Sequence, residues 1–254
     1  MMKNWLSLEG KKALVTGGSR GIGNCLAQTL HDAGAEVVIF YNHTCAEDLT
    51  AKMQGSGAAV HAVRCNVSDR AELERGVEEA ARVLGGRIDI LINAAGINRR
   101  YNLEDFPVNE WDEVINVNLN AAVYCTQLVG RYMLKQNYGR VVNLASMNSF
   151  VAGKRVGAYV ASKGAIAQMT KAFANEWGDR GIRVNAIAPG YIETDMTQAL
   201  QADSASYQSI LAHIPVGRWG KPEDLAAPVL LLVSDATDYI NGIVMPIDGG
   251  YLTR

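Results

Sequence analysis

The sequence alternates between short apolar runs rich in β-branched residues and longer helix-like stretches through almost all of its 254 residues. Runs that are apolar throughout, each followed by a helix, predict a parallel sheet covered by helices on both faces. Right-handed crossovers then give a doubly wound α/β sheet with seven strands. The runs are KALVTG (12–17), AEVVIFY (35–41), AVHAVRCNV (59–67), IDILINAAG (88–96), GRVVNLAS (139–146), IRVNAIAPG (182–190) and GIVMPIDGG (242–250).

The stretches between these runs supply the helices. Pro246, in the last run, suits an edge or terminal strand because proline cannot donate to a neighbouring strand. No repeat or low-complexity linker divides the chain, so we expect one domain over residues 1–254. Helices are expected near 21–33, 46–55, 69–84, 110–136, 157–178 and 222–234.

Composition and charge exclude several classes of protein. The formal net charge of −2 gives no electrostatic reason to expect nucleic acid. No stretch approaches about 18 consecutive apolar residues, and the first residues, MMKNWLSLEGKK, contain no apolar core of a secretory signal. The cysteines form no CxxC pair and no metal-ligand pattern with histidine, so we expect free thiols, no metal and a cytoplasmic location. These cysteines are Cys25, Cys45, Cys65 and Cys125.

A glycine-rich turn, VTGGSRGIG, follows the first run and opens the first helix. Its GxxxGxG spacing provides a tight turn, close approach of the backbone to a diphosphate, and a helix N-terminus directed at the charge. No Lys-Ser/Thr pair follows, which disfavours a mononucleotide P-loop. The turn therefore predicts dinucleotide binding on a Rossmann fold. Its expected contacts are Gly17, Ser19, Arg20, Gly21, Ile22 and Gly23.

The end of the second strand bears on the choice between NAD and NADP. An NAD site usually has Asp or Glu there to bind the ribose 2′-hydroxyl, but this sequence has Tyr41 and Asn42. Arg20, within the glycine-rich turn, is able to pair with a 2′-phosphate. We therefore expect NADP(H) in preference to NAD(H), with Tyr41 and Asn42 beside the adenosine. The alternative is that Arg20 only orders the turn.

Small residues end the fourth run as NAAG: Asn93, Ala94, Ala95 and Gly96. Their size allows this loop to pack closely under a cofactor, and Asn93 is able to bond neighbouring backbone. A merely tight connection between strand and helix is the alternative.

The segment YVASK places Tyr159 and Lys163 one helical turn apart, so that the two side chains can meet. An ammonium close to a phenol favours the phenolate and lowers its pKa. A phenol tuned in this way can exchange a proton with an alcohol or a carbonyl oxygen. An isolated pair of this kind more often represents a buried aromatic and a solvated lysine.

TGxxxGxG, NAAG, an Asn-Leu pair within a helix, a serine ending the fifth run, and YxxxK occur in this order. Together they closely resemble the short-chain dehydrogenase/reductase family over essentially the whole chain. The resemblance implies a catalytic tetrad of Asn118, Ser146, Tyr159 and Lys163. Tyr159 would exchange a proton with the substrate oxygen as hydride moves, and Ser146 would hydrogen-bond that oxygen. Lys163 would lower the pKa of Tyr159 and hold the nicotinamide ribose, and Asn118 would position a water behind Lys163.

The same resemblance implies further cofactor contacts. The segment PGYIETDM, after the sixth run, should cover the nicotinamide, and the backbone of Ile192 should bond its carboxamide. Asn66 stands where the family more often has Asp, and its carbonyl oxygen is expected to accept from the adenine amine. The contacts implied are Asn66, Val67, Pro189, Gly190, Ile192 and Thr194.

Two arginines, Arg99 and Arg100, follow the NAAG loop directly. Loops at the carboxyl ends of the strands form the ligand crevice of such a sheet, and guanidinium groups bind carboxylates in a bidentate manner. We expect these arginines to bind a substrate carboxylate; solvation or a subunit contact is the alternative. Asn148 is expected to meet sugar hydroxyls, and Lys154 and Arg155 are further candidates.

Several strings, including NRR, ASMNSF, ANEW, HIPVGRWGKPEDL and DYINGIVMPIDGGYLTR, resemble the sugar-acid branch of the family. This branch implies oxidation or reduction at C5 of a six-carbon sugar acid, with 2-dehydro-3-deoxy-D-gluconate first and gluconate second. Reduction of 3-oxoacyl groups on a carrier protein is a further alternative, although the charge balance offers no basic surface for an acidic carrier. A cofactor sensor without turnover is disfavoured because all four tetrad positions are filled. Family likeness also implies a homotetramer, and we expect residues 195–215 to form a substrate lid.

Overall fold

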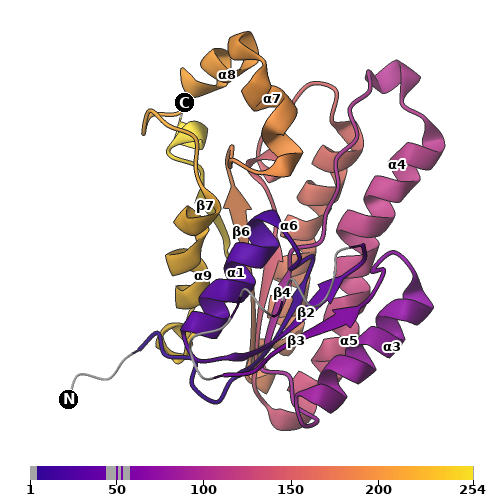
Figure 1. Ribbon diagram of the computed structural model, residues 1–254, viewed down its shortest axis with the longest axis vertical. Coiled ribbons are helices and arrows are strands. Elements are labelled where there is room, and N and C mark those ends of the chain that lie inside the picture. Colours follow the sequence, from indigo (N-terminus) through magenta and orange to yellow (C-terminus); the bar gives the residue numbers. More distant parts are fainter. Residues whose placement is uncertain (1–4, 44–49, 51–52, 54–57, 254) are drawn as a thin grey trace.

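The computed structural model describes residues 5–43, 50, 53 and 58–253 of the chain. Its strands form one parallel sheet in the order β3-β2-β1-β4-β5-β6-β7 (Figure 1). The order reverses between β1 and β4, and ligands of doubly wound sheets bind outside the carboxyl ends of the strands at such a switch point. The strands are β1 Lys12–Thr16, β2 Glu36–Tyr41, β3 Val60–Arg64, β4 Ile90–Asn93, β5 Gly139–Leu144, β6 Ile182–Pro189 and β7 Val244–Ile247.

Helices cover both faces of this sheet. Figure 1 shows α1 and α9 on one side of the sheet and α3 and α5 on the other. Within the described ranges, no helix is both long and apolar enough to cross a membrane. The helices are α1 Gly21–Asp32, α3 Arg70–Val83, α4 Val108–Ile115, α5 Ala121–Gln136, α6 Gly157–Trp177, α7 Gln198–Ala202, α8 Ser204–Leu211 and α9 Ala226–Val233.

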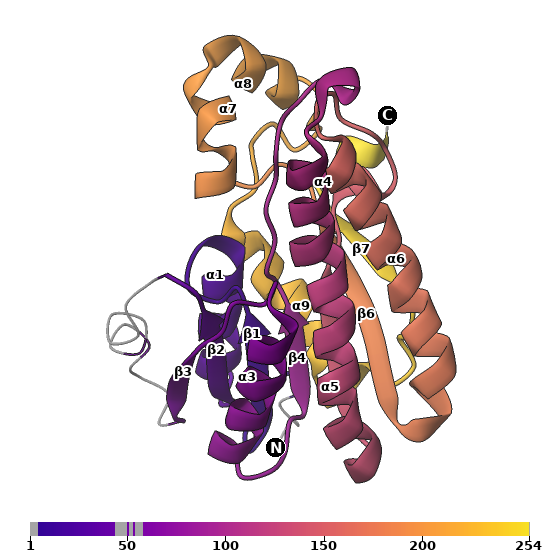
Figure 2. The same ribbon diagram turned by 90° about the vertical axis from the view of Figure 1, so that its right-hand side faces the viewer.

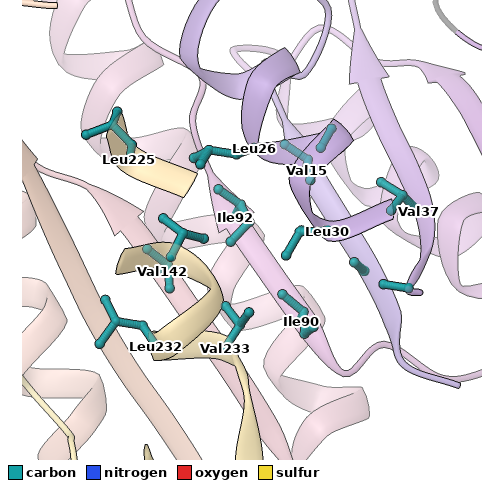
Figure 3. Close-up of a cluster of buried hydrophobic side chains, with 14 of the residues drawn as sticks. Val15, Leu26, Leu30, Val37, Ile90, Ile92, Val142, Leu225, Leu232 and Val233 are labelled. Carbon is teal, nitrogen blue, oxygen red and sulfur yellow. The ribbon is translucent and has the colours of Figure 1, made fainter. Parts of the chain in front are cut away.

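Alternate residues of each central strand enter opposite cores, because successive side chains of a strand point to opposite faces. In β1, Val15 packs with α1 and α9, whereas Leu14 packs with α3 and α5. Figure 3 shows the first core, in which Ile92 lies near Leu26 of α1. Burying such a side chain fully contributes about 1.5–3 kcal/mol. Two-sided burial is the reason that the runs are continuously apolar.

The expected elements are present with shorter ends. The run at 88–96 contains only four strand residues, because its small residues form a loop. The single helix expected near 110–136 is α4 and α5, joined by a π-helical segment, Asn116–Asn120. The helix expected near 222–234 opens with a 3₁₀ turn before α9. The helix expected near 46–55 falls largely outside the described residues.

Candidate active site

The glycine-rich turn between β1 and α1 packs tightly against the loop that follows β4. A Cβ on Gly17 would lie 2.7 Å from the Cα of Ala95, and one on Gly23 would lie 2.2 Å from the carbonyl oxygen of Gly17. Gly17 and Gly21 also have φ values of +63° and +53°, which favour glycine. The turn is therefore a narrow backbone cradle at the N-terminus of α1, suited to a diphosphate.

Thr194 faces this turn from the segment after β6. A Cβ on Gly21 would meet Thr194 Cγ2 at 3.7 Å. Ile192 is buried, and its carbonyl accepts from Thr197 Oγ1 at 2.7 Å, while its N–H makes no hydrogen bond within the described part of the chain. The segment after β6 that is predicted to contact the cofactor thus lies opposite the turn that is predicted to bind the diphosphate. The N–H of Ile192 is available to donate to a ligand.

Thr16, which the sequence analysis did not single out, fixes the NAAG loop. Its Oγ1 accepts from the N–H groups of Ala94 and Ala95 at 3.1 and 3.2 Å. Gly96 stands close to the tetrad: a Cβ there would lie 3.4 Å from Asn118 Oδ1 and 3.8 Å from Lys163 Nζ. The loop therefore runs from the glycine-rich turn to the catalytic candidates, along the path that a dinucleotide would follow. The position of Thr16 directly before the first glycine of the turn was the feature of the sequence that could have predicted this contact.

The far end of this path carries two exposed arginines. Arg20 precedes α1 at its N-cap, and it forms no ion pair with another described residue. Arg64 ends β3 and pairs in register with Tyr41, the last residue of β2, and it likewise lacks an ion-pair partner among described residues. Tyr41 and Asn42 are half-buried. The end of β2 therefore combines positive charge with the absence of a carboxylate at residues 40–42.

Ser146, Tyr159 and Lys163 meet beyond the carboxyl end of β5. Ser146 follows the strand, and the other two residues lie one turn apart on α6, with Lys163 Nζ 5.5 Å from the centre of the Tyr159 ring. Lys163 is only 4% exposed and donates to the carbonyl oxygen of Leu144 at 2.6 Å. The YxxxK pair and the strand-end serine are thus one cluster.

Asn118 joins this cluster from the π-helical segment. Its Nδ2 donates to the Ile97 carbonyl at 2.9 Å and to Ser162 Oγ at 3.1 Å, and its Oδ1 accepts from the Ile97 N–H at 2.8 Å. Segments of π-helix are frequent at functional sites, and here the segment carries the buried Asn118 toward the loop after β4. Because both amide donors are used within the protein, the side chain braces this loop against α6. The expected role of Asn118 in positioning a water stays a prediction.

The two arginines expected to bind a substrate carboxylate have different surroundings. Arg99 is bound to α4 through Glu110 at 2.6 Å and Glu113 at 2.8 Å, so its charge is already paired, and its binding to a substrate stays a prediction. Arg100 is exposed and has no ion-pair partner among the described residues. Burial raises the pKa of Tyr191, and the positive charge of Arg100 acts in the opposite direction. Arg100 therefore acts electrostatically on the residue that follows Gly190.

Asn148 lies beside the catalytic serine. Its backbone N–H donates to Ser146 Oγ at 3.1 Å, and its buried Oδ1 has no hydrogen-bond partner. An acceptor left without a donor is suited to a ligand hydroxyl. Lys154 and Arg155 are exposed, and Arg155 has a φ of +64°, which is uncommon for a residue other than glycine.

An aromatic cluster that the sequence did not reveal connects α8 to the site. Tyr207 of α8 stacks on Trp219 at 5.3 Å, with ring planes 7° apart. Tyr191 contacts Trp219 at 5.2 Å and Tyr251 at 5.6 Å. Figures 1 and 2 show α7 and α8 beyond the carboxyl ends of the strands, at one end of the molecule. The expected lid region, 195–215, thus carries both helices and rests on aromatic side chains.

Similarity to known proteins agrees with this geometry. A family model described as Enoyl-(Acyl carrier protein) reductase matches residues 17–252. The 2-dehydro-3-deoxy-D-gluconate 5-dehydrogenase of Bacillus subtilis (strain 168) is 43% identical over 249 residues, covering 98% of this chain and 97% of the relative. The chain belongs to the short-chain dehydrogenase/reductase family.

Other members of the family are similarly close. The gluconate 5-dehydrogenase of Gluconobacter oxydans (strain 621H) is 40% identical over 247 residues, covering 96% of this chain and 95% of the relative. The crystal structure of a gluconate 5-dehydrogenase from Burkholderia cenocepacia J2315, in complex with NADP and tartrate, has a TM-score of 0.93 and 34% identity. That match covers 99% of this chain and 98% of the other. The predicted family and its sugar-acid branch are therefore confirmed.

Within this dehydrogenase/reductase, burial and Ser146 act in opposite directions on the pKa of Tyr159. Burial raises the pKa of Tyr159, and a hydrogen bond with Ser146 lowers it in part. The Lys163 ammonium donates to the Leu144 carbonyl, and its Nζ lies 5.5 Å from the centre of the Tyr159 ring. Burial also lowers the pKa of Lys163 to about 8. Ser146 is therefore one group that lowers the pKa of Tyr159, and the tuning of Tyr159 by Lys163 stays a prediction.

Two predicted cofactor contacts are also engaged elsewhere. Asn93 is 4% exposed, and its Nδ2 donates to Thr126 Oγ1 at 2.9 Å and to Asn143 Oδ1 at 2.8 Å, so its amide is directed into the interior. Asn66 Oδ1 accepts from the N–H and the hydroxyl of Ser68 at 3.2 and 2.8 Å, in a local turn. The carbonyl oxygen expected to accept from adenine is thus already used.

Proposed function

We propose that this chain is an NADP(H)-dependent dehydrogenase that interconverts a secondary alcohol and a ketone at C5 of a six-carbon sugar acid. 2-Dehydro-3-deoxy-D-gluconate is the preferred candidate substrate. One observation carries the proposal: Ser146, Tyr159 and Lys163 converge beside the glycine-rich cradle, in a chain 43% identical over 249 residues to an enzyme of that name. A close identity to gluconate 5-dehydrogenase makes gluconate the second candidate.

The residues present fit a dinucleotide. The narrow cradle at Gly17, Gly21 and Gly23 would hold the diphosphate, and Lys163 would reach the ribose beside the nicotinamide. Arg20 would pair with the 2′-phosphate, and the Ile192 N–H would bond the carboxamide. When bound, the nicotinamide supplies or accepts the hydride. NADP in the related Burkholderia structure supports the phosphate-bearing cofactor.

The chemistry at the substrate oxygen falls to Tyr159 and Ser146. Tyr159 would give a proton to the oxygen during ketone reduction and take it back during alcohol oxidation. Ser146 would donate its one hydroxyl proton to the same oxygen, where negative charge develops. Before substrate binds, the same hydroxyl bonds Tyr159 and lowers the pKa of the phenol in part. Half-burial of Tyr159 limits competition from water.

The substrate would lie between these residues and the lid. Arg100 would bind the carboxylate, since its guanidinium has no ion-pair partner in the described chain. Asn148 Oδ1 would accept from a sugar hydroxyl. Residues 195–215, with α7 and α8, would close over both. Arg100 is thus the residue by which the enzyme would prefer an acid to a neutral polyol.

Nicotinamide absorbance tests the proposed reaction directly. Purified protein is offered 2-dehydro-3-deoxy-D-gluconate and D-gluconate, each with NAD and with NADP. We expect fastest turnover of the first acid with NADP, and loss of turnover in Tyr159→Phe with NADPH binding retained. Turnover of gluconate alone would favour the second candidate. Protein that binds NADPH and acts on neither acid would contradict the proposal.

We also propose that the enzyme assembles as a homotetramer. β7 forms one edge of the sheet, and its apolar residues are only half-buried. Ile243, directly before this strand, is 40% exposed, and Tyr239 is fully exposed. Exposed apolar edge strands are usually covered by another element or chain. Light scattering should give about four times the chain mass of 27.4 kDa, and a monomer mass would contradict this assembly.

A further inference from the structure

Two hydroxyl groups outside the tetrad connect its members in pairs. Ser149 Oγ donates to the carbonyl oxygen of Lys163 at 2.7 Å and accepts from the N–H of Ser146 at 3.3 Å. Ser162 Oγ donates to the carbonyl oxygen of Tyr159 at 2.7 Å and accepts from Asn118 Nδ2 at 3.1 Å.

These two links join segments that are otherwise separate in the chain. Ser149 ends the 3₁₀ turn that Ser146 caps, and its bond to Lys163 ties the end of β5 to the middle of α6. Ser162 is fully buried on α6, and it ties that helix to the π-helical segment through Asn118. A buried donor whose partner is removed costs free energy, so these bonds hold their segments in place.

We propose that Ser149 and Ser162 are positioning residues for the reaction. Ser149 holds Ser146 at a fixed place relative to the helix of Tyr159 and Lys163, and Ser162 holds Asn118 against the same helix. The inference rests on the proposed function, because it takes Tyr159 as the proton donor and acceptor.

The role of Ser149 has a measurable electrostatic consequence. Ser146 is the group whose hydrogen bond lowers the pKa of Tyr159, and Lys163 is the charged group beside the ring, with Nζ 5.5 Å from its centre. Ser149 contacts the backbone of both. When the hydroxyl of Ser149 is removed, Ser146 gains freedom and the hydrogen bond between Ser146 and Tyr159 weakens. The pKa of Tyr159 then rises, although Ser149 itself does not touch the phenol in any contact described.

Ser234 provides a matched control. It is fully buried, and it lies far from Ser149 in the sequence. Its Oγ donates to the Leu231 carbonyl at 3.1 Å and accepts from the Ala236 N–H at 3.3 Å. This is the same pattern as at Ser149, one backbone acceptor and one backbone donor, without a catalytic residue in it. Ser234→Ala therefore measures what the loss of such a hydroxyl does to the fold alone.

The test titrates Tyr159 in the full-length protein without substrate, by NMR of an isotopically labelled tyrosine ring carbon. Tyr159→Phe assigns the signal. We expect Ser149→Ala to raise the pKa of Tyr159 by about half a unit, equivalent to weakening one hydrogen bond. Ser149→Thr, which keeps the hydroxyl, should restore it, and Ser234→Ala should leave it unchanged. In turnover assays, kcat of Ser149→Ala and Ser162→Ala should fall about tenfold, with the Kd for NADPH unchanged.

The outcomes separate the two proposals. A Tyr159 pKa that is the same in wild type and Ser149→Ala, with kcat unchanged in both alanine variants, overturns the positioning role. Equal pKa shifts in Ser149→Ala and Ser234→Ala also overturn it, since the effect would then be general loosening. Wild-type protein without turnover on sugar acids contradicts the proposed function alone, because the titration needs no substrate. If an alanine variant fails to fold, Ser149→Cys and Ser162→Cys provide the comparison.

Discussion

Lys163 is a lysine that the fold keeps away from water, and burial lowers its pKa to about 8. The unfolded chain, with a value near 10.5, binds the proton more tightly, so stability rises with pH between these two values. Below about pH 8 the cost of the buried charge is fully present, on the order of 3 kcal/mol. Lys163→Met should therefore raise the free energy of unfolding at pH 7 and abolish turnover.

Urea unfolding at pH 7 and pH 10 checks this prediction. The gain from Lys163→Met should shrink as pH rises above about 8 and disappear near pH 10.5, where the lysine is uncharged in both the folded and the unfolded wild type. Loss of the bond to the Leu144 carbonyl reduces the gain by about 1 kcal/mol. A variant less stable than wild type at pH 7 would show that the ammonium is well solvated in the fold.

Arg99 and Arg100 form a matched pair for testing substrate recognition. Arg100→Gln should raise KM for a sugar acid about tenfold, because a guanidinium–carboxylate contact is lost, and leave the Kd for NADPH unchanged. Arg99→Gln breaks the contacts to Glu110 and Glu113, which should lower stability by about 1 kcal/mol and leave KM within about twofold. Steady-state kinetics and thermal unfolding separate the two effects. Equal rises in KM would contradict the assignment of Arg100.

At the scale of single residues, the sequence predicted where a side chain lies when a motif fixes the backbone around it. Ser146, Tyr159 and Lys163 were found because strand end and helical turn determine where their side chains meet. The ion pairs of Arg99 were not predicted because its partners lie on α4, and the sequence spacing of charged residues does not show which of them pair. The bond from Lys163 to the Leu144 carbonyl was not predicted, because an ammonium has several acceptors within reach and only coordinates show which one it takes.

At the scale of elements, the strands were predictable and the interruptions were not. Each apolar run contains its strand, and the central strands are largely apolar because both of their faces are buried, but small residues continue past the strand ends and obscure where each strand stops. The π-helical segment Asn116–Asn120 contains no proline or glycine to mark an interruption, so one continuous helix was expected. The aromatic contacts under α8 join segments after β6 and β7, which no local pattern brings together.

We expect the stack of Tyr207 on Trp219 to hold the proposed lid, residues 195–215, in its closed position. Tyr207→Ala removes an aromatic pair worth about 1 kcal/mol, which corresponds to about a fivefold change in an equilibrium between closed and open lid. KM for the sugar acid should rise several-fold, the Kd for NADPH should stay constant, and Trp219 fluorescence should shift to longer wavelength. Ser209→Ala, on the exposed side of the same helix, is the control. If both variants behave alike, the stack does not hold the lid.

On the scale of the whole molecule, the two ends of the sheet have different tasks. The carboxyl ends carry the glycine-rich cradle, the proposed tetrad and the proposed lid, and their polar groups include acceptors without donors, such as Asn148 Oδ1. The amino ends are tied by ionic contacts between distant segments. Lys11 bonds Asp235 at 3.1 Å, Tyr138 donates to the same carboxylate at 2.9 Å, and the buried Arg140 pairs with Asp238 at 3.1 Å.

This division predicts that the amino-end network sustains stability without affecting catalysis. Burial acts to raise the pKa of Asp235, but hydrogen bonds from Lys11 and Tyr138 outweigh it and the pKa is lowered. The stabilisation is therefore present above the unfolded value of 3.8 and is lost as pH falls through the lower folded value. Asp235→Asn should cost about 1 kcal/mol at pH 7, since the carboxylate is more than half exposed and screened by solvent.

Chemical unfolding of wild type and Asp235→Asn across the acid range, together with steady-state kinetics at neutral pH, tests this separation. The difference in unfolding free energy should vanish in strong acid, where the wild-type carboxyl is also protonated, and kcat should be the same in both proteins. A lower kcat in Asp235→Asn would mean that the two ends are coupled through the strands. A difference that persists in acid would mean that the side chain acts through packing, because an uncharged carboxyl and an amide then differ only in shape and hydrogen bonding.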